Sequence, residues 1–212
     1  MPIKLNTTDV SIPGYAKAYF NGNLMWLADL PPAYLRVEGF SFNNNCYFTI
    51  TGLKLTGADT IRFTFKPKSG SNVFGSYTTT SAQNNYSLFI STASTTSKYM
   101  RYNGGTYASG FTSGELNVQR DVVITPTGSS GLPRNGTWTQ ADFVCDIDMN
   151  IGTTSPDATS AKFIGDMIGN FVVDGKFCGV PCKRISDNTL GYFDLYTRTF
   201  FTPAVGTPTV VE

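Results

Sequence analysis

The feature that most constrains the fold is residues 142–151, where apolar and polar side chains alternate over ten positions. Val144 is the one exception. The apolar set is Phe143, Cys145, Ile147, Met149 and Ile151, and the polar set is Asp142, Asp146, Asp148 and Asn150. A period of two predicts a β-strand with one buried face and one solvated face. A strand of this length needs a large sheet, so we expect it to lie centrally in a β-sandwich.

Short candidate strands separated by turn residues fill the rest of the chain. Residues 59–66 alternate clearly, and Ile61, Phe63 and Phe65 are predicted to face inwards. The other candidate strands are residues 35–42, 47–53, 73–77, 86–91, 99–102, 106–109, 118–125, 163–174, 176–184, 190–195 and 199–202. About a dozen such strands predict an all-β fold, a jelly-roll sandwich of two antiparallel sheets, with a meandering barrel as the alternative.

The chain divides into three segments by composition. Residues 1–29 contain three candidate strands, at 4–10, 15–20 and 23–27, with a hairpin turn at Asn21-Gly22-Asn23. Such a small β appendage buries little surface alone, so we expect it to dock on a partner or on the main domain. Residues 30–203 form the sandwich, and residues 204–212 are predicted to be a trailing tail.

Composition excludes several classes of function. The 16 basic and 15 acidic residues nearly cancel, which speaks against nucleic-acid binding. No apolar run is long enough for a membrane span, and no signal peptide is recognisable. Histidine is absent, which removes histidine-based catalytic triads and zinc sites. We expect the four cysteines to be buried, reduced thiols.

Three stretches together resemble proteins of one group. They are Ala16-Lys17-Ala18-Tyr19-Phe20-Asn21-Gly22-Asn23-Leu24-Met25-Trp26, Leu30-Pro31-Pro32-Ala33-Tyr34-Leu35-Arg36-Val37-Glu38-Gly39-Phe40 and Pro181-Cys182-Lys183-Arg184-Ile185-Ser186-Asp187-Asn188-Thr189-Leu190-Gly191-Tyr192-Phe193-Asp194-Leu195. The chain resembles tail and appendage proteins of phages and prophages of gut bacteria, with a concanavalin A-like, laminin-G-like sandwich. The resemblance implies a non-enzymatic virion protein.

Asp146 and Asp148 are the carboxylates with a chemical pattern. Because they are two positions apart on one predicted strand, their side chains would share a face of the sheet. Glycosidases with a concanavalin A-like fold, which this chain resembles, use paired carboxylates on such a strand. Those enzymes carry glutamates there, whereas this strand reads Asp146-Ile147-Asp148-Met149-Asn150. We therefore predict a solvated sheet face and no catalytic residue. Calcium ligation by Asp146 and Asp148 is the alternative, and we expect no other cofactor.

Aromatic residues are the second candidate site, because sugars stack on rings. Tyr99, Arg101, Tyr102 and Tyr107 are predicted to line an exposed hairpin around Asn103-Gly104-Gly105. Trp138, just after a glycine-rich loop, is a further candidate. The alternative for each is packing in the core or across strands.

Two hypotheses of function follow. The first is a phage tail, fibre or capsid appendage subunit located in the virion. Residues 1–29 would bind other virion proteins, the chain would form a homo-oligomer, for which we expect a trimer, and the sandwich would contact a host-surface glycan. The second is a bacterial carbohydrate-binding or glycoside hydrolase domain.

Overall fold

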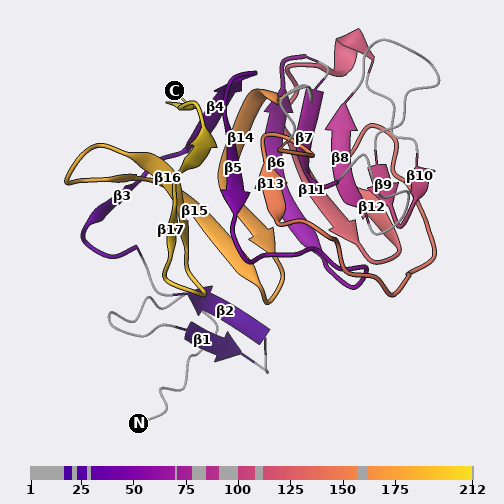
Figure 1. Ribbon diagram of the computed structural model, residues 1–212, viewed down its shortest axis with the longest axis horizontal. Coiled ribbons are helices and arrows are strands. Elements are labelled where there is room, and N and C mark those ends of the chain that lie inside the picture. The colour runs from indigo at the N-terminus through magenta and orange to yellow at the C-terminus, as the bar shows by residue number, and fades with distance from the viewer. Residues whose placement is uncertain are drawn as a thin grey trace.

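The computed structural model describes residues 17–20, 23–27, 30–69, 71–77, 85–90, 100–107, 112–156 and 162–211. Within these residues the chain is all-β, apart from the short 3-10 turn η1 (Ser113–Glu115), and it forms two facing antiparallel sheets (Figure 1). No helix in this part of the chain is long and apolar enough to cross a membrane. The predicted all-β sandwich is confirmed.

The smaller sheet has seven strands, in the order β10-β9-β8-β7-β13-β5-β18. Their bounds are β5 (Tyr47–Ile50), β7 (Ser71–Ser76), β8 (Tyr86–Ile90), β9 (Met100–Tyr102), β10 (Gly105–Tyr107), β13 (Met149–Ile151) and β18 (Pro203–Val205).

The larger sheet has ten strands, seven of them in the order β12-β11-β6-β14-β15-β16-β17. Strand β4 pairs with β14 and β19, and β3 pairs with β15. The bounds are β3 (Tyr34–Arg36), β4 (Gly39–Asn43), β6 (Ile61–Pro67), β11 (Arg120–Thr125), β12 (Gly128–Ser130), β14 (Ile164–Val173), β15 (Phe177–Arg184), β16 (Leu190–Asp194), β17 (Phe200–Phe201) and β19 (Thr209–Val210).

Aromatic rings from both sheets fill the main core. The ring centroids of Phe63 on β6 and Phe74 on β7 are 5.4 Å apart. Phe48 on β5 lies 5.5 Å from Phe40 on β4 and 4.9 Å from Tyr192 on β16. Rings at these spacings attract each other beyond the burial of their surface, so they hold the layers together.

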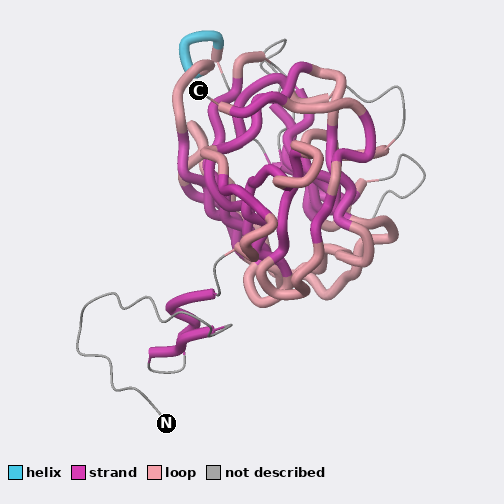
Figure 2. Tube along the Cα trace, turned by 90° about the vertical axis from the view of Figure 1, so that its left-hand side faces the viewer, coloured by secondary structure: helices cyan, strands magenta, loops and turns pink. Residues whose placement is uncertain are grey.

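Residues 17–27 form a separate two-stranded sheet of β1 (Lys17–Phe20) and β2 (Asn23–Leu27). Strand β1 confirms the predicted strand at 15–20 over the residues that the structure describes, and β2 confirms the one at 23–27. The predicted strand at 4–10 falls outside the described residues. Among the described strands, β1 and β2 pair only with each other. Figure 2 shows them beside the sandwich.

The prediction of one long strand over residues 142–151 is wrong. Only β13 (Met149–Ile151) is a strand, although it does lie centrally, between β7 and β5. The preceding residues follow the irregular loop 53–57, to which they are joined by separate backbone hydrogen bonds such as Cys145 N to Leu55 O at 2.8 Å. The alternation correctly predicted burial of Phe143 and Cys145, but an irregular neighbour cannot complete a ladder.

Residues 204–212 were predicted to be a trailing tail, and four of them, Ala204, Val205, Thr209 and Val210, lie in strands of the two sheets. In β18, Val205 pairs with Tyr47 of the smaller sheet, and in β19, Val210 pairs with Phe40 of the larger sheet. The chain therefore closes one end of the sandwich with its last residues. The predicted strand at 35–42 is likewise divided, between β3 and β4.

Candidate functional site

An open depression lies where β5 and β13 pair on the outer face of the smaller sheet. On these strands Phe48, Ile50, Met149 and Ile151 are buried in the core, so the alternating Thr49 and Asn150 belong to the other face. We name it the β5/β13 depression, with a volume of about 390 Å³. It is lined by Thr49, Lys54, Asp146, Ile147, Asp148, Asn150 and Pro156.

Hydrogen bonds hold the floor of the depression in place. The Asn150 side chain is only 1% exposed. Its Oδ1 accepts a hydrogen bond from Thr49 Oγ1 at 2.8 Å, and its Nδ2 donates to the Asp148 carbonyl at 3.1 Å. Polar groups fixed in this way are pre-organised, because a ligand need not immobilise them.

Asp148 also has a structural role beside the depression. Its Oδ2 accepts a hydrogen bond from the Gly52 N–H at 3.1 Å. Gly52 has a φ of 84°, a conformation that favours glycine, in the turn that follows β5. Asp148 therefore stabilises this turn, and its Oδ2 atom is already engaged in a hydrogen bond within the protein.

Asp146 and Lys54 supply the accessible charges of the depression. Both side chains are exposed, and neither forms an ion pair with any residue that the structure describes. The carboxylate accepts hydrogen bonds and the ammonium donates them. The arrangement suits a ligand with hydroxyl groups, because a hydroxyl can donate a hydrogen bond to the carboxylate and accept one from the ammonium.

The depression fits calcium poorly. The structure brings the two predicted ligands, Asp146 and Asp148, to one depression. Calcium takes 6–8 oxygen ligands, and the described residues contain no group of three or more acidic, cysteine or histidine side chains that could hold a metal. The Lys54 ammonium in the same depression repels a cation.

Two predicted sugar-stacking residues are core residues instead. Tyr102 is 1% exposed, and its hydroxyl donates to the Gly57 carbonyl at 2.7 Å and accepts from the Ala141 N–H at 3.0 Å. Trp138 is buried, with its ring 5.4 Å from that of Tyr102. The prediction that these two rings face a ligand is therefore wrong, and packing, the alternative, holds for both.

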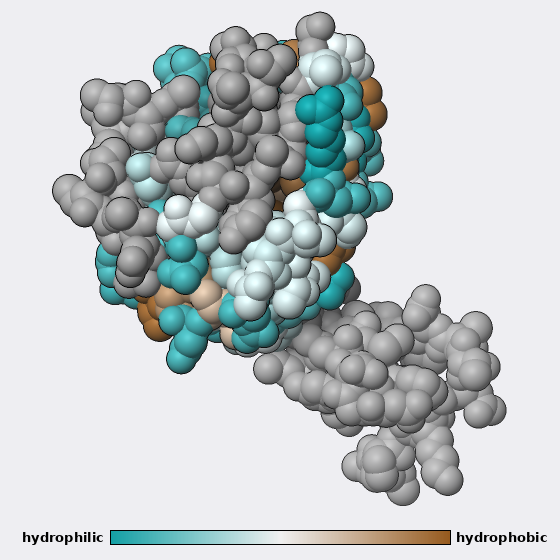
Figure 3. Space-filling view, turned by 90° about the vertical axis from the view of Figure 1, so that its right-hand side faces the viewer, coloured by the Kyte–Doolittle hydropathy of each residue, from teal (hydrophilic) through white to brown (hydrophobic). Residues whose placement is uncertain are grey.

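The other predicted residues of the hairpin are only partly described. Arg101 on β9 pairs with Thr106, and Tyr107 on β10 pairs with Met100. Their side chains, and all of Tyr99, lie outside the described residues. Figure 3 views this end of the sandwich, where the coloured surface is mostly hydrophilic with small brown areas.

Sequence reasoning missed Thr49 and Lys54 as neighbours of Asp146. The outward position of Thr49 could have been predicted from the parity of its position in the strand at 47–53. Its neighbour on the adjacent strand, Asn150, is 101 residues away in sequence. No local sequence pattern predicts that Thr49 and Asn150 lie side by side.

Comparisons with protein-family models, curated proteins and solved structures found no match to this chain.

Proposed function

We propose that the chain is a non-enzymatic structural subunit of a phage particle. In this proposal residues 1–29 attach the subunit to other virion proteins, and the concanavalin A-like sandwich faces outwards. The observation that carries it is the separate sheet of β1 and β2, which pairs with no other described strand of the chain. An isolated two-stranded sheet is marginally stable in water, so it needs a surface to pack on, and a neighbouring subunit would supply one.

The proposed recognition surface is the β5/β13 depression, facing a host-surface glycan. Support comes from the exposed carboxylate of Asp146 and the exposed ammonium of Lys54 beside the fixed polar floor. A single contact of this size is weak. A homotrimer, the form we propose, would present several copies and gain affinity through effective concentration.

Incorporation into particles tests the attachment role. We expect deletion of residues 1–29 to abolish incorporation, while the full chain carrying Asp146→Asn is incorporated normally. Normal entry of the truncated chain into particles would refute the docking role. Genes for portal, capsid and tail proteins beside this gene would support the viral origin, and light scattering of the purified chain tests the trimer.

A glycan array tests the recognition surface. We expect Asp146→Asn and Lys54→Ala each to weaken any glycan binding of the intact chain at least tenfold. The control is Asp187→Asn, which changes an exposed aspartate at the tip of the β15–β16 hairpin. Equal binding by all variants would remove the depression from the proposal.

The alternative function, a bacterial carbohydrate-binding or glycoside hydrolase domain, is favoured by one observation, the presence of two aspartates in one depression. Turnover of a polysaccharide that is lost on substitution of Asp146 and Asp148 by asparagine would favour this alternative. Binding without turnover would leave the structural proposal intact.

A further inference from the structure

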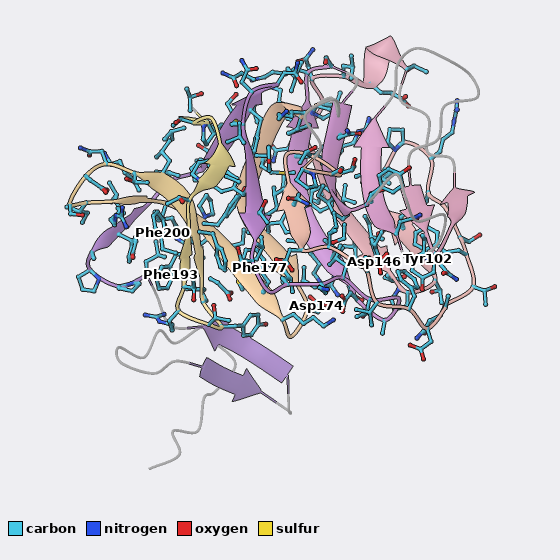
Figure 4. The ribbon with its side chains drawn as sticks, viewed as in Figure 1. Tyr102, Asp146, Asp174, Phe177, Phe193 and Phe200 are labelled. Carbon is cyan, nitrogen blue, oxygen red and sulfur yellow. The ribbon has the colours of Figure 1, made fainter. Side chains whose placement is uncertain are left out.

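A second hydrophobic cluster lies on the outer face of the larger sheet, apart from the main core. On β15 the side chains alternate, so Phe177 enters the main core while Cys178, Val180 and Cys182 enter the second cluster. Phe193 of β16 belongs to the same cluster. Figure 4 shows Phe193 and Phe200 at the end of the sandwich away from Tyr102 and Asp146.

Residues 30–36, which we call the strap, cover this cluster. Leu30 and Tyr34 pack against it, and β3 pairs with the end of β15, Tyr34 opposite Arg184 and Arg36 opposite Cys182. The strap therefore connects the β1–β2 sheet to the sandwich, and through Leu30 and Tyr34 it also packs against the second cluster.

Tyr34 is the centre of the strap's packing. Its ring centroid lies 4.8 Å from that of Phe193 and 5.0 Å from that of Phe200. Arg198 lies 5.0 Å above the Phe193 ring, and Arg184 lies 5.3 Å above the Phe200 ring. Three rings and two guanidinium groups thus form one stack, in which Tyr34 is the only ring that the strap contributes.

The strap is held by few contacts compared with the sandwich. Its strand has three residue pairs, at the edge of the sheet. Backbone hydrogen bonds add two anchors, Ile185 N to Ala33 O at 2.9 Å and Val37 N to Pro181 O at 3.0 Å. Because the second cluster shares no buried residue with the main core, opening it leaves the facing sheets packed. Segments of this kind open at lower free energy than the whole domain.

We propose that the strap is a releasable cover that detaches as a unit while the sandwich stays folded. Closed, it fixes the direction in which residues 17–27 leave the sandwich; released, it leaves them on a flexible tether. The biological meaning of the two states rests on the proposed attachment role, but the opening itself does not.

The reactivity of each cysteine thiol can show whether the strap opens while the main core stays closed. All four are buried and reduced. Cys178 and Cys182 belong to the second cluster, against which the strap packs, whereas Cys46 and Cys145 lie in the main core. Burial raises the pKa of the Cys178 and Cys182 thiols to about 11. Release of the strap removes that burial, so thiolate forms more readily and reagents reach it.

In the experiment, the full chain is treated with an alkylating reagent under native conditions at pH 8. Peptide mass spectrometry then measures the rate of alkylation of each cysteine. We expect Cys178 and Cys182 to react together, at least tenfold faster than Cys46 and Cys145. Tyr34→Ala should accelerate the first pair at least tenfold further and leave the second pair unchanged. Tyr34→Phe keeps the ring and is the matched control, expected to react like the unmodified chain.

A second measurement does not depend on any variant folding. Low urea concentrations accelerate an opening in proportion to the surface it exposes. In the unmodified chain, reaction of Cys178 and Cys182 should therefore depend less steeply on urea than reaction of Cys145. Equal rates and equal urea dependence at all four cysteines would overturn the proposal, because the cluster would then open only with the whole domain. Loss of particle incorporation with unchanged cysteine reactivity would concern the attachment role alone.

Discussion

Two buried tyrosines of the main core should respond in opposite directions to the same substitution by phenylalanine. The Tyr102 hydroxyl is hydrogen-bonded to the backbone of Gly57 and Ala141. The Tyr192 hydroxyl is fully buried and has no hydrogen-bond partner among the residues that the structure describes, and burial raises its pKa well above the ordinary value of 10.0. The test therefore separates hydrogen bonding from ring packing.

The expected change in the free energy of unfolding depends on which polar groups each substitution leaves without a hydrogen-bond partner. Tyr102→Phe strips the partner from one carbonyl and one N–H, and a buried group without a partner costs about 1–3 kcal/mol. Ala141 is only half-buried, so water can replace one of these bonds, and we expect a loss of about 2 kcal/mol. Tyr192→Phe removes a hydroxyl whose unpaired burial costs roughly 1–3 kcal/mol, but it leaves a small gap, so we expect a gain of about 1 kcal/mol.

Urea unfolding at pH 7 in the presence of a reducing agent measures both free energies. Both variants keep their ring contacts, 5.0 Å from Tyr102 to Phe143 and 4.9 Å from Tyr192 to Phe48, so the slopes against urea should match that of the unmodified chain. A difference of about 3 kcal/mol between the variants is the expected result, from a loss of about 2 and a gain of about 1.

Changes of the same sign and size in both variants would refute this reasoning. Unchanged stability in Tyr102→Phe, together with loss of glycan binding, would return Tyr102 to the ligand-contacting role that the sequence suggested.

The other predictions concern alkaline pH and a buried turn. Burial raises the pKa of Cys145 to about 12 and those of Cys178 and Cys182 to about 11, against an ordinary value of 9.0. The unfolded chain then loses these protons first, so the stability they contribute is full below pH 9 and falls above it. These three thiols contribute a fall of at most about 4 kcal/mol per pH unit, roughly 1.4 for each, and Cys46, whose pKa is also raised by burial, adds to it. Urea unfolding in reducing agent from pH 7 to 10.5 should show this fall, and a flat profile would contradict it. Asp194→Ala should lower the free energy of unfolding by about 3 kcal/mol, because the buried Asp194 carboxylate accepts bonds from three backbone N–H groups and one threonine hydroxyl. Asp142→Ala is the control, because Asp142 is exposed and forms no ion pair or hydrogen bond with a residue that the structure describes, and it should leave the free energy of unfolding nearly unchanged.

Local alternation predicted the inward faces well. Ile61, Phe63 and Phe65 are all buried, as their positions in the predicted strand at 59–66 require. Side-chain direction in a strand depends on the parity of the position alone, so it can be predicted before the strand's neighbours are known. Strand pairing depends on segments far apart in sequence, and no periodicity encodes that a loop at 53–57 would run beside residues 143–149.

The prediction that Arg101 and Tyr102 both line an exposed hairpin could have been avoided by considering the alternation of side chains along a strand. Arg101 and Tyr102 are consecutive in the sequence of one predicted strand, so parity alone predicts that only one of them can line an exposed surface. Tyr102 takes the inner face, where it packs on Tyr86 at 5.5 Å. Trp138 has no flanking alternation, so its burial had no local signal.

The strap and the β5/β13 depression lie in different parts of the sandwich, and this separation has a consequence for the proposed function. Figure 4 places Phe193 and Phe200, on which the strap packs, well away from Asp146. An attachment segment leaving beside the strap would keep the depression clear of the particle. Substitutions at sites without shared partners add in free energy, so Tyr34→Ala and Asp146→Asn should act independently. Their combination should open the strap as much as Tyr34→Ala alone and weaken glycan binding as much as Asp146→Asn alone; coupling between the two would mean that the sandwich transmits the state of its attachment to its recognition surface.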